Sequence, residues 1–267
     1  MKRVVLCADD YAIAPGVSRG IRELVALGRL NATSVMTVFE GLPEAAPALD
    51  AACAGRAVSI GLHVTLTGGF APLTAPAARF PTLSGRLIEF LTGRLDRAAL
   101  AAEVEAQFAT FQAVFGRPPD HVDGHQHVHV LPGVRDVVIA AAARHAPGAW
   151  LRDVRPAAPG LDGPGLKARL IGAFGAGFPA AAARARLRTS GRFAGAYDFS
   201  AGSDFAALLR RFLAGLPEGG LAMVHPGHVD ATLAARDPVT DQRAREYAVL
   251  ASDAFPGLLA SAGVRLF

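Results

Sequence analysis

Short apolar runs that end abruptly in polar residues recur along the first part of the chain. These runs span residues 4–8, 34–39 and 57–62. Each run is typical of a β-strand buried on both faces. Between them, apolar residues repeat at helical spacing from Pro15 to near Gly28, and an Ala-rich helix is expected over residues 43–54. Strands that alternate with helices predict a parallel sheet covered by helices.

The remainder of the chain continues this alternation. Further strands are expected near residue 120 and over residues 149–154, 220–224 and 264–267. The expected helices span residues 96–115, 133–145, 205–216 and 238–261, the last interrupted at Pro256. Residues 70–94 and 156–203 show no clean period and predict irregular excursions. The pattern therefore predicts an α/β fold of about seven parallel strands, which we interpret as a single domain over residues 1–267.

Composition and charge predict a large globular core and no nucleic acid partner. The chain has 267 residues, 51% of them hydrophobic, which is enough for a large core. The net charge of +4 and the pI near 9.6 come almost wholly from arginine, because lysine occurs only at Lys2 and Lys167. Since no basic helix with interleaved aromatic residues accompanies this charge, no nucleic acid partner is expected. A homo-oligomer remains compatible with the composition.

The cysteines and the first residues indicate the compartment. Cys7 and Cys53 form neither a metal-type CxxC motif nor a disulfide framework, as is typical of a reducing cytoplasm. The chain reaches Asp9 after only a few apolar residues, too soon for the hydrophobic region of a signal peptide. No uncharged run of 18 or more apolar residues follows. We therefore expect a cytoplasmic protein without stable membrane insertion.

Ligand-type side chains lie at the carboxyl ends of four expected strands. They are Asp9 and Asp10, His63, His125 and His225. In barrels of parallel strands, this end carries the active site. One carboxylate and two imidazoles would hold a metal ion with open positions, which leaves the second aspartate as a base and His225 as a candidate acid. The simpler alternative is that the two aspartates cap the following helix.

Half of the eight histidines fall within residues 120–132. In an extended strand, the odd positions of 121–129 would share one face at intervals of roughly 6 to 7 Å, so only one or two of them could bind the same ion. A helical conformation would instead pair His125 with His129 as in zinc proteases, but Gln126 stands where that chemistry needs a glutamate. A third interpretation is that these histidines only fill a polar strand end.

A few other polar side chains near these strand ends are candidates for contacting a substrate. Arg152 is expected at the same end as the histidines, where it would hold a carboxylate, orient Asp9 or form a surface pair. The remaining candidate contacts are Tyr11, Thr65, His127 and His228.

Five motifs together resemble one known family. They are Ala-Asp-Asp-Tyr at 8–11, Gly-Leu-His at 61–63, His-Val-Asp-Gly-His-Gln-His-Val-His at 121–129, Arg-Thr-Ser-Gly-Arg-Phe-Ala-Gly at 188–195 and His-Pro-Gly at 225–227. In this order they look like the YdjC-like carbohydrate deacetylases, also called the ChbG/HpnK family. The resemblance spans nearly the whole chain, and it is the joint occurrence of the motifs that makes it specific.

The resemblance implies a fold, a cofactor and a substrate class. The fold is a distorted (β/α) barrel, and the cofactor is one divalent metal ion, Mg or Zn, bound by Asp10, His63 and His125. The substrate is an N-acetylated sugar, either a chitooligosaccharide or acetylglucosamine carried on a hopanoid lipid. Asp9 would then act as the base and His225 as the acid. Two alternatives remain: a non-catalytic metal- or sugar-binding protein, and an iron(II) oxygenase with a facial triad.

Overall fold

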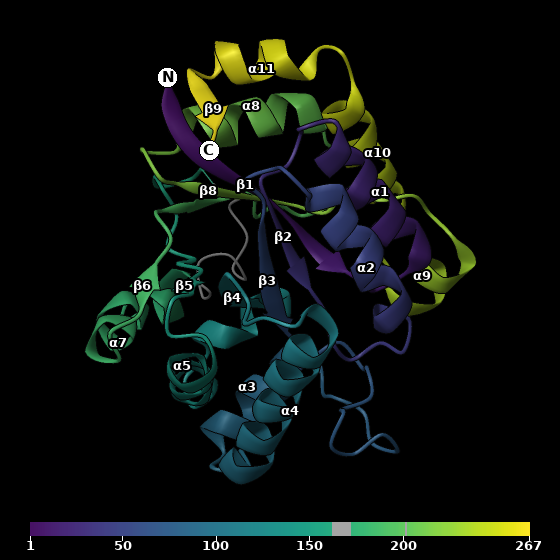
Figure 1. Ribbon diagram of the computed structural model, residues 1–267. Coiled ribbons are helices and arrows are strands. Elements are labelled where there is room, and N and C mark those ends of the chain that lie inside the picture. The colour runs from purple at the N-terminus through teal and green to yellow at the C-terminus, as the bar shows by residue number, and fades with distance from the viewer. Residues whose placement is uncertain (162–171, 201) are drawn as a thin grey trace.

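The first strand, β1 (Lys2–Tyr11), lies inside a curled sheet (Figure 1). The computed structural model describes residues 1–161, 172–200 and 202–267. The other strands are β2 (Ala32–Val35), β3 (Ser59–Val64), β4 (His121–Gly124), β5 (Trp150–Leu151), β6 (Arg188–Thr189), β7 (Phe193–Ala194), β8 (Leu221–Val224) and β9 (Val264–Leu266). Their order is β6-β5-β4-β3-β2-β1-β8-β7, and β9 also pairs with β1. All pairings between these strands are parallel.

Helices surround the curled sheet on its outside (Figure 1). They are α1 (Pro15–Ala26), α2 (Leu42–Cys53), α3 (Leu83–Leu91), α4 (Arg97–Phe115), α5 (Val134–His145), α7 (Phe178–Arg184), α8 (Phe205–Gly215), α9 (Ala231–Arg236), α10 (Asp241–Ala251), α11 (Phe255–Ser261) and the 3-10 helix η1 (His125–Val130). An isolated bridge between Pro156 and Phe193 links the chain after β5 to β7, at the far end of the strand order. The expected α/β fold with a curled parallel sheet is thus confirmed.

Local signals explain why α4 forms where the pattern predicted a helix. The side chain of Asp96 accepts a hydrogen bond from the backbone N–H of Ala99, and Gly116 ends the helix in the left-handed region at φ 66°. Five apolar side chains of this helix are buried in the main core: Leu100, Val104, Phe108, Phe111 and Phe115. The helix therefore holds its buried side against the sheet as the sequence pattern indicated.

The two stretches expected to be irregular contain regular elements. Residues 70–94 include α3, whose first turn is capped by the Thr82 side chain. Within residues 156–203, the described part includes α7, β6 and β7, while residues 162–171 and 201 lie outside the described residues. Strands of two residues are too short to show a period of two, which explains why the sequence predicted about seven strands and the described part contains nine.

Three expected elements have different bounds. The strand expected over 34–39 is β2, which ends at Val35, and the strand expected over 149–154 is the short β5. The helical segment expected over 238–261 is two helices, α10 and α11. Pro256 does not interrupt a helix but lies in the first turn of α11, where the missing N–H of proline is tolerated.

Candidate metal centre

A cavity of about 830 Å³ opens where the carboxyl ends of several strands meet. Its polar lining residues come from distant parts of the chain and include Asp9, Asp10, His63, His125, His225 and Arg243. Most of the remaining wall is apolar and includes Phe70, Tyr197, Phe199 and Val239. The cavity is therefore lined by both polar and apolar side chains, as is common for small-molecule sites.

A backbone irregularity brings both aspartates to this cavity. In a regular strand, Asp9 and Asp10 would point to opposite faces. The pairing of β1 with β2 instead shifts register between Ala8 and Tyr11, and Asp10 adopts φ 66° in the left-handed region. A residue other than glycine rarely adopts this conformation, and such strained residues cluster at functional sites. Both carboxylates consequently line the same cavity.

Asp10, His63 and His125 offer one ligand atom each within 4.8 Å of one another. Asp10 Oδ1 lies 3.2 Å from His63 Nε2 and 3.1 Å from His125 Nδ1. Two ligands about 2.1 Å from a shared ion, at angles between octahedral and tetrahedral, lie about 3.0 to 3.4 Å apart. The three side chains therefore fit a divalent ion.

Charged neighbours keep the Asp10 carboxylate ionised. Although burial opposes ionisation, Arg243 and His125 hold the pKa of Asp10 well below its usual range. Asp10 thus presents an anionic oxygen to any ion held here.

The backbone after β4 separates the clustered histidines. Gln126 and His127 adopt φ 53° and 60°, so the chain turns into η1 and the alternation of an extended strand ends at Gly124. His127 lines the cavity, but His129 is directed elsewhere, with Nε2 placed 3.0 Å from the carbonyl oxygen of Arg152. The strand therefore ends at Gly124, and the odd-numbered side chains after it do not continue along one face.

Asp123 and Arg152 form a buried layer behind the ligands. His63 Nδ1 donates to Asp123 Oδ1 at 2.6 Å, which leaves Nε2 facing Asp10. A carboxylate behind a histidine in this way fixes the ring orientation at metal sites. Arg152 contacts the other oxygen of Asp123 and donates to both oxygens of Asp9 at 2.6 Å. One buried guanidinium therefore links Asp9 to the residue that orients His63.

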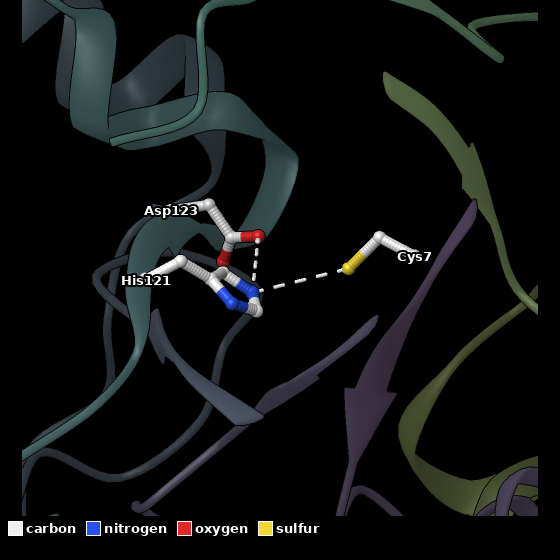
Figure 2. A group of neighbouring side chains, drawn as sticks. All are labelled: Cys7, His121 and Asp123. Atoms are coloured by element: carbon white, nitrogen blue, oxygen red, sulfur yellow. Dashed lines mark hydrogen bonds and ion pairs between the residues drawn. The ribbon is translucent and has the colours of Figure 1, made fainter. Parts of the chain in front are cut away.

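A second ligand-type group, Cys7, His121 and Asp123, lies deeper in the sheet interior (Figure 2). Figure 2 shows the thiol of Cys7 and the carboxylate of Asp123 both directed at the His121 ring. Arg152 Nη2 lies 3.2 Å from Cys7 Sγ, so the positive charge of a guanidinium already lies beside this group. Ser34 also donates to Asp123 at 2.6 Å. Because burial raises the pKa of the Cys7 thiol, this group is best described as a hydrogen-bonded support layer.

His225 follows β8 and faces the cavity with an unpaired nitrogen. Its backbone N–H donates to Glu246 Oε2 at 2.5 Å, and its Nδ1 has no hydrogen-bond partner among the described residues. Burial lowers the pKa of His225 to about 4, although Asp10 acts in the opposite direction. The imidazole is therefore neutral at neutral pH in the free protein.

Helix α10 contributes functional residues that the sequence analysis missed. Its buried side carries Gln242, Arg243 and Glu246. Arg243 Nη2 donates to Asp10 Oδ2 at 2.6 Å and also pairs with Asp237. Buried polar groups are costly, so such a helix face marks a functional element. In the sequence these three polar residues resemble a solvated helix face, so no local signal identified them.

The other candidate substrate contacts, Tyr11, Thr65 and His228, lie outside the lining of the cavity. Tyr11 is buried, and its hydroxyl donates to a backbone carbonyl of α2. Thr65 is buried and hydrogen-bonded through its backbone to Gln107. The His228 imidazole lies 2.6 Å from Glu23.

Comparisons with known proteins place the chain among related sequences. The model of a family described as YdjC-like protein matches residues 3–261. Chitooligosaccharide deacetylases of Yersinia pestis (strain Pestoides F) and Yersinia pseudotuberculosis (serotype O:1b, strain IP 31758) are each 36% identical over 149 residues, which cover 53% of this chain and 56% of the relative. The chain thus spans about half the length of the curated relatives it matches.

A solved structure shows a similar fold over the full length. It comes from Enterococcus faecalis V583, where its role in cellobiose-phosphate cleavage is assigned only provisionally. The alignment covers 100% of this chain and 97% of that chain, with a TM-score of 0.75 and 20% identity, so the likeness concerns the fold alone. In the described part of this chain, no helix is long and apolar enough to cross a membrane.

Proposed function

Because the chain belongs to the YdjC-like family, we propose that it hydrolyses the acetamide of an N-acetylated sugar with the help of one divalent metal ion. The observation that carries this proposal is the convergence of Asp10, His63 and His125 in a cavity that Asp9 also lines. The names of the Yersinia relatives favour a chitooligosaccharide as the sugar, and an acetylated glycolipid is the other candidate.

The ion would be held by Asp10, His63 and His125. When bound, it supplies Lewis-acid chemistry, namely polarisation of an acyl oxygen and acidification of a water molecule. Carboxylate oxygen and imidazole nitrogen suit either Mg or Zn, so the metal is identified by chelation followed by metal add-back.

Asp9 is the proposed general base. Its two oxygens each accept a hydrogen bond from Arg152, which fixes the carboxylate in one orientation beside the cavity. A carboxylate held in this position can take a proton from the attacking water while the oxygen of that water bonds to the acyl carbon. Arg152 is thus a positioning residue for this base.

His225 is the proposed acid for the departing nitrogen. Because its pKa in the free protein is about 4, the imidazole takes up a proton from solvent as the substrate complex forms, and Asp9 later returns the proton of the attacking water to solvent. The negative charge that develops on the acyl group favours the protonated imidazole. Transfer of that proton to nitrogen allows the C–N bond to break, and the products are acetate and the free amine of the sugar.

Acetate release from diacetylchitobiose and related N-acetyl sugars tests the proposal. The protein is first stripped with a chelator and then reloaded separately with Mg and Zn, with bound metal measured by elemental analysis. We expect acetate only after reloading, and the Asp9→Asn variant serves as the metal-loaded inactive control. No acetate from any of these sugars, with metal confirmed in the protein, would contradict the proposed deacetylation.

A further inference from the structure

Arg243 carries a buried hydrogen-bond donor for which the described part of the chain offers no acceptor. The side chain is buried and lines the cavity. Its Nε donates to the carbonyl oxygen of Val239, and its Nη2 donates to Asp10 and Asp237. Nη1 has no hydrogen-bond partner among the residues that the structure describes. A buried donor left without an acceptor is unfavourable, so Nη1 calls for a partner that enters the cavity.

The chemistry of this nitrogen restricts what that partner is. Buried nitrogens of His127 and His225 are also unpaired at the cavity, but an imidazole nitrogen either donates or accepts. A guanidinium nitrogen can only donate a hydrogen bond, and the guanidinium group remains positively charged at every working pH. The partner of Nη1 is therefore an oxygen acceptor, and a negatively charged oxygen suits it best.

The position of Nη1 connects it to the reacting group. The guanidinium is a rigid planar fork, and its Nη2 is 2.6 Å from Asp10 Oδ2. The other oxygen of Asp10 faces His63 and His125. Nη1 therefore belongs to the same planar group that binds Asp10, one of the three side chains that converge on the proposed ion.

We propose that Arg243 is a catalytic residue whose Nη1 donates a hydrogen bond to the acyl oxygen of the substrate as this oxygen gains negative charge. This inference rests on the proposed deacetylation. The guanidinium group that carries this donor is already oriented by Asp10, Asp237 and Val239, and such preorganisation is what lets a donor stabilise a developing charge. Removal of one such donor typically lowers kcat by about 100- to 1000-fold.

Arg243→Lys is the decisive variant, because lysine keeps the charge near Asp10 but lacks the second terminal nitrogen. On diacetylchitobiose we expect kcat to fall by about 100-fold, with KM changed by less than about threefold and bound metal unchanged. Arg245→Lys is the matched control, since Arg245 lies on the exposed side of the same helix. A rise in KM at unchanged kcat, or loss of bound metal, would overturn the assignment.

Binding of a tetrahedral analogue separates this inference from the proposed function. The probe is a methylphosphonamidate analogue of diacetylchitobiose, whose anionic oxygen imitates the charged acyl oxygen. We expect Arg243→Lys to bind it about 100-fold more weakly than the unaltered protein, while chitobiose binds equally to both. If the unaltered protein releases no acetate, the proposed deacetylation is contradicted. The analogue still tests the Arg243 contact, because equal affinity of the unaltered protein and Arg243→Lys for the analogue would contradict that contact. Arg243→Gln gives the same comparison if the lysine variant does not fold.

Discussion

Asp123 accepts a hydrogen bond from His63 Nδ1 at 2.6 Å, and this contact leaves Nε2 of His63 free to face Asp10. Replacement of Asp123 by asparagine removes the charge that fixes this ring. We expect Asp123→Asn to lower metal affinity by about 10- to 100-fold, measured by competition with a chelator. Asp120→Asn, in the residue just before β4, is the matched control and should bind metal normally. Unchanged affinity in Asp123→Asn would contradict this role.

The two adjacent aspartates should respond differently to the same substitution. Asp9→Asn should retain metal and most substrate affinity but reduce turnover by at least about 100-fold, because it removes a positioned base. Asp10→Asn should instead weaken metal binding. Bound metal and turnover are measured side by side on both variants. Metal lost from Asp9→Asn but kept in Asp10→Asn would reverse the two roles.

Three histidine variants test the ligand set. His63→Ala and His125→Ala should lower the metal stoichiometry, because both side chains lie within reach of Asp10 Oδ1. His129→Ala should bind metal as the unaltered protein does, since His129 contacts the backbone of Arg152. Elemental analysis of the three purified variants provides the comparison, and equal loss in all three would rule out this set.

Glu246 should make stability depend on pH. Burial raises the pKa of Glu246 to about 7 from an ordinary value near 4.5. The folded state therefore binds the proton more tightly than the unfolded state, so this group's stabilisation is complete below about pH 4.5 and is lost as pH rises through about 7. The loss amounts to roughly 3 kcal/mol.

Denaturant unfolding at several pH values checks this expectation. Glu246→Gln keeps one acceptor oxygen for the His225 N–H, its amide N–H can donate to the Tyr197 hydroxyl, and the side chain does not titrate. The difference in unfolding free energy between the two proteins should shift in favour of Glu246→Gln as pH rises between about 4.5 and 7. A difference that stays constant over this range would show that Glu246 has an ordinary pKa.

Gly61 should be intolerant of any side chain. A Cβ atom at this position would lie 2.2 Å from the ring of His121, which is itself buried and stacked on Trp150 at 4.3 Å. We expect Gly61→Ala to destabilise the fold by about 1 to 3 kcal/mol, because the stacked ring cannot move away. Gly41→Ala, where nothing lies within 4 Å, is the control in a thermal unfolding experiment. Equal melting temperatures would contradict this packing argument.

The sequence predicted the parts of the site that follow strands. Asp10, His63 and His125 each come near the end of a buried strand or just after one, and parallel strands bring such positions to one edge. The structure places the three together, although their role as ligands remains a prediction. Strand alternation failed for Asp9 and Asp10, because the irregular end of β1 reverses the direction of one side chain.

The parts that the sequence did not predict depend on long-range packing. Arg243 and Glu246 lie on a helix whose polar residues look like a solvated face in one dimension. Only the packing of α10 over the strand ends shows that this face is buried. The sequence analysis named Asp9 as one possible partner of Arg152, and the structure pairs the two. Nothing local to Arg152 indicates that it also contacts Asp123, which lies in a different strand from Asp9.

The pairings of β1 also have a consequence for how the chain acquires its structure during synthesis. Val5 pairs with Leu221 and Lys2 with Val264, so one side of this inner strand depends on residues made more than two hundred positions later. At about 5 to 20 residues per second, the nascent strand waits roughly 10 to 40 s for β8. During this interval its unpaired edge is exposed to aggregation or to chaperones, and the cavity forms only after residues 236–239 and Arg243, which also line it, have been made.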